Sequence, residues 1–277
     1  MVATQSAYAK INLFLDVIGR REDGFHNIFS VMQSVSLCDE ISITAKKSDI
    51  SSITLRCNDD DLSVGDDNLI MKAAKRYLEH NDIKAELDIT LKKIIPIGAG
   101  LGGGSSDAAA TLRALNNIFK ASTKDELIEI ASGLGSDVPF CLLGGRAICT
   151  GRGEKIEPIK DYLFNNIVVA IGKERVSTPA AYKALDEKYS DFDYGCYKPI
   201  QYSGQHYNIF ESVINIAEID NIKEIMTKNK AESSMMSGSG PSVFGIFTTA
   251  DDAIHAEDEL IKNGFFACYC HTVKGEL

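Results

Sequence analysis

The sequence predicts an α+β protein of two lobes, and three observations lead to this prediction. Apolar and polar residues alternate in several segments between residues 7 and 57, as in a meander of half-buried antiparallel strands. A glycine-rich segment at residues 96–104 then runs into an amphipathic helix. From residue 167 onward, short apolar strands are interspersed with helical patterns. Helices on one side of an antiparallel sheet form the α+β arrangement, and residues 158–166 are expected to be the hinge.

Composition narrows the class of protein before any motif is considered. The 277 residues carry a formal net charge of −10, which argues against nucleic acid as the main partner and requires a local site for any anionic substrate. No apolar run approaches the length of a membrane span and no signal-peptide pattern opens the chain, so a cytoplasmic location without a membrane partner is expected. The seven cysteines are scattered without a C-x-x-C pair, which favours reduced thiols over a zinc site.

The first strand is expected at residues 7–18. Lys10 and Asn12 share its non-core face, about 7 Å apart, among otherwise apolar neighbours. A solvated face and a functional polar pair are both consistent with this segment alone. A charged turn follows, and His26 stands near the start of the next strand at residues 25–37, where nothing local separates a structural from a ligand-binding histidine.

The chain then continues through the first lobe toward the glycine-rich segment. A turn at residues 39–40 is expected to precede a strand pair between residues 41 and 57. Asp67 or Asn68 is suited to cap a helix that follows. An alternating strand at residues 84–95 delivers the chain into the glycines.

Residues 96–112 read PIGAGLGGGSSDAAATL, and they are predicted to form a phosphate-binding loop. Glycine takes φ > 0 and lets the backbone approach a bulky ligand closely. Ser105 or Ser106 is expected as the N-cap of the following helix, with Asp107 in its first turn. Free N–H groups and the positive dipole end at a helix N-terminus form an anion site.

Two other interpretations of this loop are weaker. Residues 98–103 also fit the dinucleotide pattern G-x-G-x-x-G, but the acidic residue expected at the end of a second strand is replaced by a capping box at residues 123–126. No Lys-Ser or Lys-Thr pair follows the last glycine, so the Walker pattern is absent. A flexible linker is disfavoured because linkers lack a capped amphipathic helix directly after them.

Asp137 lies in the segment GSDVPF, for which two interpretations stay open. It can be the N-cap of a short helix with Pro139 in the first turn, or a functional carboxylate that needs a partner charge. A hairpin is expected at residues 144–154.

The second lobe is expected to begin with a buried strand at residues 167–171. A helix opens at Thr178 with Pro179 in its first turn, and Tyr182 on it serves packing or stacking at the lobe interface. The remaining elements are expected as irregular structure at 186–205, helices at 207–218 and 221–229, a glycine-rich turn at 237–241, a strand at 242–247, a helix at 249–263 and a strand at 265–273.

The segments AYAKINLFL, DGFHNI, PIGAGLGGGSSDAA, GSDVPF and SGSGPSVF, in this order and spacing, resemble the GHMP small-molecule kinase superfamily. The resemblance covers nearly the whole chain. It implies a two-lobe GHMP kinase fold with the active site in the cleft between lobes. The implied division is an N-terminal ATP-binding domain at residues 1–158, with a mixed or antiparallel sheet and helices, and a C-terminal substrate-side domain at residues 159–277, a ferredoxin-like α/β sandwich.

The Lys-x-Asn strand, the Gly-aromatic-His turn and the Gly-Ser-Asp-Val-Pro segment narrow the resemblance further. They imply ATP-dependent phosphorylation of the 2-hydroxyl of 4-diphosphocytidyl-2-C-methyl-D-erythritol, a step of the non-mevalonate route to isoprenoid precursors. Lys10 and Asp137 match the family's catalytic pair. A carboxylate within reach of the alcohol serves as base, while an ammonium orients it and offsets charge in the transition state. Because that ammonium favours the ionised carboxylate, Asp137 is expected to act mainly at the transition state.

The resemblance also implies binding residues. Those for the cytidyl diphosphate substrate are Asn12, Phe25, His26 and Tyr182, with Phe25 standing where many members have a tyrosine whose hydrogen bond is lost here. Those for ATP are Pro96, Ile97, Gly98, Ala99, Gly100, Leu101, Gly102, Gly103, Gly104, Ser105 and Ser106, with Asn68 and Lys93 near the adenosine. Mg²⁺ is expected from the chemistry, with the Ser105 hydroxyl as a candidate ligand. No oligomer is required.

Three other functions remain as alternatives. Another GHMP kinase of the homoserine or mevalonate type would lack cytosine recognition. A nicotinamide oxidoreductase would bind NADH with the same glycines, and a non-catalytic nucleotide sensor would keep its function when Asp137 is replaced by alanine.

Overall fold

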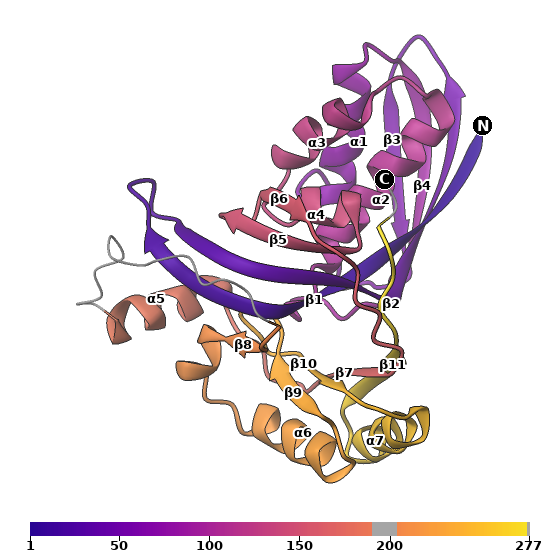
Figure 1. The fold of residues 1–277 in the computed structure, drawn as a ribbon. Coiled ribbons are helices and arrows are strands. Elements are labelled where there is room, and N and C mark those ends of the chain that lie inside the picture. Colours follow the sequence, from indigo (N-terminus) through magenta and orange to yellow (C-terminus); the bar gives the residue numbers. More distant parts are fainter. Residues whose placement is uncertain (190–203, 276–277) are drawn as a thin grey trace.

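The structure is a computed structural model that describes residues 1–189 and 204–275. Figure 1 shows an upper lobe with the first part of the chain and a lower lobe with the last part, joined along the long strand β1. The expected α+β architecture of two lobes is confirmed. Its division at residues 158 and 159 stays a prediction. No helix in the described parts is long and apolar enough to cross a membrane.

The first sheet is mixed and rests on two long antiparallel strands, β1 and β2. Within the described residues its strands are β1 (Val2–Arg20), β2 (His26–Lys47), β3 (Ser52–Cys57), β4 (Ala85–Lys92), β5 (Arg146–Gly151), β6 (Lys155–Pro158) and β8 (Tyr207–Asn208). The first half of β2 pairs with β5 and its second half with β4, while β3 joins β4 in parallel. The hairpin expected after residue 144 is β5–β6.

The turn expected at residues 39–40 is wrong, because β2 runs through it without interruption. The carboxylate of Asp39 accepts hydrogen bonds from the backbone N–H groups of Ile94 and Ile95 and forms an ion pair with Lys93. These partners satisfy a buried charge inside a strand, so the polar pair Asp39-Glu40 does not break the chain direction. The expected strand pair at residues 41–57 is also separated, since β4 lies between β2 and β3.

Four helices belong to the first lobe. They are α1 (Leu69–His80), α2 (Gly103–Phe119), α3 (Lys124–Ser132) and α4 (Val138–Leu143). The central helix α2 packs against β1, β2, α1 and α4. Its N-cap is Gly102 in the left-handed conformation, which lies three residues before Ser105, the first of the two serines expected as the cap. Ser106 is inside the helix, because its hydroxyl donates to the backbone carbonyl of Tyr8 instead of capping.

The second lobe is built on an antiparallel sheet of order β11-β7-β10-β9. Its elements are β7 (Ile167–Ile171), α5 (Thr178–Lys188), α6 (Ala217–Lys228), β9 (Ser233–Met236), β10 (Val243–Ile246), α7 (Ala250–Lys262) and β11 (Phe266–Cys270). The β-α-β-β-α-β order of a ferredoxin-like fold is formed by β7, α6, β9, β10, α7 and β11. The helices α6 and α7 lie on one side of the sheet (Figure 1). The expected sandwich is confirmed.

The helix expected at residues 207–218 is wrong. That segment forms β8, which pairs in parallel with β1, and a 3₁₀ turn at Ile209–Ser212. The side chain of Asn208 donates to the carbonyls of Met236 and Gly238, and these tertiary bonds override the helical pattern. Irregular structure was expected at residues 186–205, but the first three of these residues belong to α5, which ends at Lys188. Residues 190–203 lie outside the described residues.

Candidate active site

Two adjoining cavities lie beside the glycine-rich loop. The larger, of about 700 Å³, lies between the lobes and is lined by Lys10, Asp137 and Tyr182 among others. The smaller, of about 410 Å³, lies between the loop and the start of α1. Gly100, Gly102 and Ser105 line both cavities, so the loop is the wall that the cavities share.

The glycine-rich loop is held in place by close contacts that only glycine permits. Gly100 has a φ of 75°, and a Cβ there would lie 2.5 Å from the carbonyl oxygen of Ser237. Gly102 has a φ of 70°, and a Cβ there would lie 2.9 Å from Cγ of Lys10. The loop is therefore pressed between β1 and the second glycine-rich turn, with the N-terminus of α2 at its end.

Lys10 extends from β1 along the loop. Its Nζ donates to Oδ1 of Asn12 at 2.7 Å and to the carbonyl of Gly100 at 2.9 Å, and it lies 3.8 Å from Oδ2 of Asp137. The Lys10 side chain is only 5% exposed, whereas that of Asp137 is 30% exposed. The interpretation of Lys10 and Asn12 as a solvated face is wrong, because both residues are buried at the cleft. Two fixed acceptors hold the ammonium beside the carboxylate.

Asp137 occupies the N-cap position of α4, with Pro139 in the first turn as the sequence suggests. Its carboxylate, however, makes no capping hydrogen bond. The backbone carbonyl alone serves the helix, by accepting from Cys141 at 3.0 Å. Asp137 is therefore the N-cap residue through its backbone alone. Its side chain faces the larger cavity beside the ammonium of Lys10, the partner charge that a functional role would require.

The opposite end of the larger cavity is aromatic. The His26 ring stacks on Tyr182 with centroids 4.7 Å apart and an interplanar angle of 21°, and Tyr182 meets the edge of Phe210 at 5.0 Å. Burial raises the pKa of Tyr182 to about 12, so its phenol stays neutral. Nε2 of His26 lies 2.7 Å from Oδ1 of Asp186.

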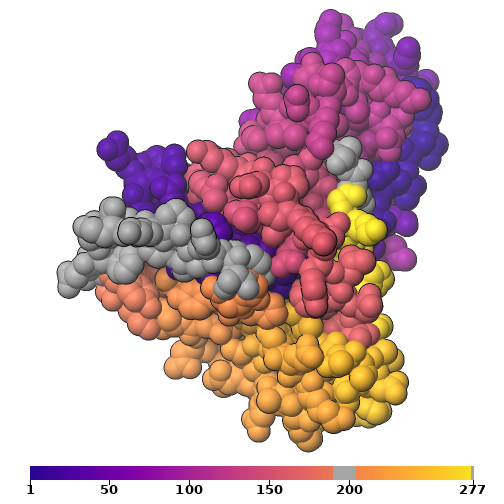
Figure 2. Space-filling model, viewed as in Figure 1, coloured from indigo at the N-terminus to yellow at the C-terminus, as the bar shows by residue number. Residues whose placement is uncertain are grey.

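Phe25 is at the mouth of the same cavity, at the tip of the β1–β2 hairpin. Its side chain is 54% exposed, and the guanidinium of Arg152 lies 5.1 Å from the ring centroid. Figure 2 shows this indigo tip standing out from the first lobe beside the β5–β6 segment. The ring is available for stacking, without the hydroxyl of a tyrosine.

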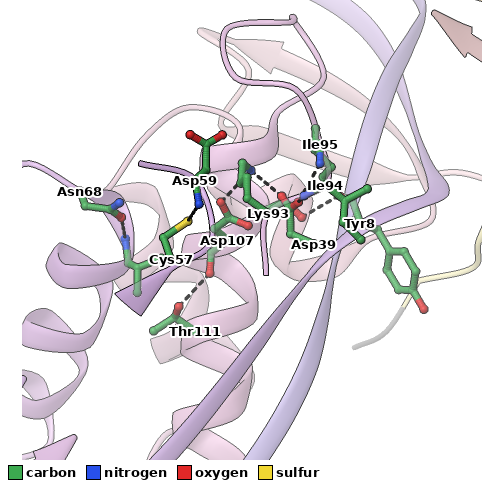
Figure 3. Close-up of polar contacts among 12 residues, drawn as sticks. Tyr8, Asp39, Cys57, Asp59, Asn68, Lys93, Ile94, Ile95, Asp107 and Thr111 are labelled. Carbon is green, nitrogen blue, oxygen red and sulfur yellow. Dashed lines mark hydrogen bonds and ion pairs between the residues drawn. The ribbon is translucent and has the colours of Figure 1, made fainter. Parts of the chain in front are cut away.

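Lys93 and Asn68 lie on the side of the smaller cavity (Figure 3). Lys93 lies between two carboxylates, forming an ion pair with Asp39 and another with Asp107 at 3.0 Å. Asn68 caps α1 by accepting from the N–H of Ile70 at 2.8 Å. Both side chains therefore have structural partners at the wall of the cavity.

Asp107 is the least satisfied member of this cluster. Burial raises its pKa to about 7 despite the neighbouring Lys93 ammonium. Its Oδ1 is buried and has no hydrogen-bond partner in the described residues. Asp107 lies inside α2 and not in its first turn, because the helix begins at Gly103.

The two serines after the glycines differ in position. Ser105 lines both cavities, whereas Ser106 is fully committed behind the loop. The hydroxyl of Ser106 donates to the carbonyl of Tyr8 at 2.6 Å, and its N–H donates to the carbonyl of Gly102 at 2.8 Å. The other residues expected at the nucleotide, from Pro96 to Gly104, all line the smaller cavity.

Three charged residues that lie in these walls or directly behind them were not identified from the sequence. Asp39 appeared only as a turn residue, although an acid inside an apolar strand is a signal of a buried partner. Asp186 follows Tyr182 by four residues on α5 and so shares its helix face, which was a usable signal. Arg20, which lies 3.7 Å from Asp186, had no local signal.

Comparisons with known proteins identify the family of this chain. The family models described as GHMP kinases N terminal domain and GHMP kinases C terminal match residues 68–145 and 201–265. The 4-diphosphocytidyl-2-C-methyl-D-erythritol kinase of Clostridium novyi is 38% identical, over 91% of this chain and 92% of that protein. The kinase of the same name from Caldicellulosiruptor saccharolyticus is 40% identical, over 92% of this chain and 91% of that protein.

A solved structure gives the same result in three dimensions. The crystal structure of 4-(cytidine 5'-diphospho)-2C-methyl-D-erythritol kinase superposes with a TM-score of 0.83 at 32% identity, covering 99% of this chain and 100% of that one. The resemblance found in the motifs is confirmed. The chain therefore belongs to the 4-diphosphocytidyl-2-C-methyl-D-erythritol kinases of the GHMP superfamily, and it is an ATP-dependent small-molecule kinase.

Proposed function

We propose that this protein transfers the terminal phosphoryl group of ATP to the 2-hydroxyl of 4-diphosphocytidyl-2-C-methyl-D-erythritol. The product is the 2-phosphate, an intermediate of the non-mevalonate route to isoprenoid precursors. One observation carries the proposal: Nζ of Lys10 and Oδ2 of Asp137 converge to 3.8 Å at the wall shared by the two cavities. Residues 127 positions apart in the chain supply an ammonium and a carboxylate to one point.

We place the two substrates in the two cavities. The cytidyl end of the acceptor lies at Phe25, His26 and Tyr182, and its methylerythritol end lies at Lys10, Asn12 and Asp137. ATP lies along the smaller cavity, with its adenosine near Asn68 and Lys93. Its phosphates rest on the N–H groups of residues 98–105, and Ser106 holds the loop from behind. The terminal phosphate then reaches the shared wall at Gly100 and Gly102.

Asp137 accepts the proton of the acceptor hydroxyl, and Lys10 offsets the negative charge of the transition state. The Asp137 carboxylate accepts the proton of the 2-hydroxyl as the phosphoryl group arrives. Lys10 keeps two of its N–H groups on Asn12 and Gly100, so the third is directed by fixed geometry toward the reacting centre. Rotation of the ammonium is restrained, which reduces the entropic cost of assembling the transition state.

Mg²⁺ fits this site as an ion bound mainly through the nucleotide. The described residues contain no group of three His, Cys, Asp or Glu side chains that could hold a metal. Mg²⁺ in kinases is held by one or two protein oxygens together with substrate phosphates and waters, so such a group is not needed. Ser105, which lines both cavities, is the oxygen donor that we assign. The ion would neutralise phosphate charge.

We also propose a cytoplasmic location. The six cysteines in the described part of the chain are free thiols, as is typical of a reducing compartment. Burial raises the pKa of the Cys141 and Cys149 thiols, which keeps them protonated beside the active site.

The function is tested by incubating the purified protein with ATP, Mg²⁺ and 4-diphosphocytidyl-2-C-methyl-D-erythritol and recording phosphorus NMR spectra. A new phosphomonoester resonance that grows as ADP forms is expected. Equal turnover of homoserine or mevalonate would contradict the assigned acceptor, and no phosphorylation of any acceptor would contradict the kinase reaction itself.

A further inference from the structure

We propose that Asp186 is a positioning residue that sets the tautomer of His26 and thereby makes the acceptor site select cytosine over uracil. The inference deepens the proposed function, since it concerns the same acceptor site. It follows from one contact, between Nε2 of His26 and Oδ1 of Asp186 at 2.7 Å.

The contact fixes which nitrogen of His26 carries the proton. An ionised carboxylate accepts hydrogen bonds and donates none, so the hydrogen between these atoms belongs to Nε2 of the imidazole. The guanidinium of Arg20 lies 3.7 Å from the other oxygen of Asp186 and forms an ion pair with it. In a neutral imidazole, Nδ1 is then the unprotonated acceptor.

The stack on Tyr182 holds the ring of His26 in one orientation beside the larger cavity. The two rings are 4.7 Å apart and tilted by 21°, and Tyr182 also makes a T-shaped contact with Phe210. His26 and Asp186 both line the larger cavity, and no contact with Nδ1 occurs among the residues that the structure describes. A base that enters this end of the cavity meets an acceptor nitrogen held in one orientation.

Cytosine and uracil differ in what they offer to such an acceptor. The pairing edge of cytosine carries one donor, the exocyclic amino group, so an acceptor Nδ1 pairs with that group. Uracil presents a carbonyl oxygen at the same place, which sets two lone pairs against each other. A site with a buried polar group left unpaired rejects the wrong ligand strongly.

The test compares two acceptors with the full-length enzyme and ATP at about pH 8, where an imidazole in water is neutral. The acceptors are 4-diphosphocytidyl-2-C-methyl-D-erythritol and its uridyl counterpart, and the measured quantity is the ratio of their kcat/KM values. Asp186→Asn supplies an amide that donates as well as accepts, so either tautomer of His26 becomes possible. The preference for cytosine is expected to fall by about tenfold or more, with the KM for ATP unchanged.

Glu187→Gln is the matched control. Glu187 is exposed, follows Asp186 on the same helix, and pairs only loosely with Lys183 at 3.8 Å. This variant should keep the wild-type ratio. If Asp186→Asn slows both acceptors equally, or leaves the ratio as in wild type, the inference is wrong although the wild-type kinase reaction stands.

A measurement on the wild-type protein guards against a variant that does not fold. Nitrogen-15 NMR of the imidazole distinguishes protonated from unprotonated ring nitrogens. A proton on Nε2 of His26 is expected, and a proton on Nδ1 alone would overturn the inference. Absence of phosphorylation by the wild-type enzyme would instead count against the proposed function.

Discussion

Two lysine–carboxylate clusters flank the glycine-rich loop, and they differ in how open they are. Lys10 and Asp137 lie 3.8 Å apart, with Asp137 facing the larger cavity. Lys93 is tightly paired with Asp39 and Asp107, and all three side chains are almost fully buried (Figure 3). The open pair leaves the Asp137 carboxylate 30% exposed, whereas the closed cluster fastens β2 and α2 to the segment directly after β4. We propose that the same residue types serve chemistry in one place and stability in the other.

The largest expected effect is on turnover at the open pair. Asp137→Ala removes the proposed base, so kcat should fall by about 10²–10⁴-fold. The affinity for ATP and the free energy of unfolding should change little, because the Asp137 side chain makes no capping bond. Steady-state kinetics, ATP titration and chemical denaturation measure the three quantities. A large loss of stability with unchanged kcat would reverse the assignment of the two clusters.

The closed cluster should respond in stability. Asp39→Ala leaves the buried Lys93 with one remaining carboxylate and removes acceptors from the N–H groups of Ile94 and Ile95. The free energy of unfolding should fall by about 3–5 kcal/mol, as for other broken buried ion pairs. Urea denaturation of Asp39→Ala and Asp137→Ala compares the free energies of unfolding of the two variants. Equal values would contradict the distinction between the closed cluster and the open pair.

The raised pKa of Asp107 should make the free energy of unfolding depend on pH. Its pKa is about 7 in the folded protein, above the value of an aspartate in an unfolded chain, so the folded state holds the proton more tightly. The stability that this proton contributes is complete below about pH 4 and is lost as the pH rises to about 7. Asp107→Asn cannot titrate, and its free energy of unfolding should vary less across this window.

Denaturation at several pH values between about 4 and 8 tests this prediction against wild type. Asp252→Asn is a suitable control, because hydrogen bonds to Lys230 and Thr249 lower the pKa of Asp252 and shift its effect to the acid side. If the free energy of unfolding varies with pH in the same way for wild type and Asp107→Asn, the pH dependence does not come from Asp107 and the prediction is wrong.

The smallest effect is expected outside both clusters, at Phe25. Phe25→Tyr adds a hydroxyl to a residue that is mostly exposed here. One additional hydrogen bond should lower the KM for the cytidyl acceptor by about two- to tenfold, with kcat and stability unchanged. A changed kcat would mean that this position influences the reacting end of the substrate.

Sequence patterns were sufficient for much of the fold. Alternation located β1 and β4, an apolar run located β7, and caps located α1 and α3, because these signals are local. The unbroken β2 and the short β8 were not predictable in the same way. Asp39 and Asn208 are satisfied by partners 55 and 28 residues away, and local patterns contain no information on such partners.

The candidate site also has features that local patterns predict and features that only tertiary packing determines. The glycine loop could be recognised from its own residues, and the roles of Lys10 and Asp137 came from family motifs. The distance between these two side chains, the burial of Lys10 and the commitment of Ser106 to the carbonyl of Tyr8 depend on tertiary packing. Asp186 had a helical spacing to Tyr182, but only the fold brings it to His26.

A single-turnover measurement of the phosphoryl-transfer step tests the central assignment most directly. Wild type and the isosteric Asp137→Asn variant are mixed in excess with limiting radiolabelled ATP, Mg²⁺ and saturating cytidyl acceptor, and the reaction is quenched at millisecond to minute times. We predict a transfer rate for Asp137→Asn that is at least about 10²-fold lower, with ATP bound as tightly as in wild type. A transfer rate within a few-fold of wild type would contradict the account.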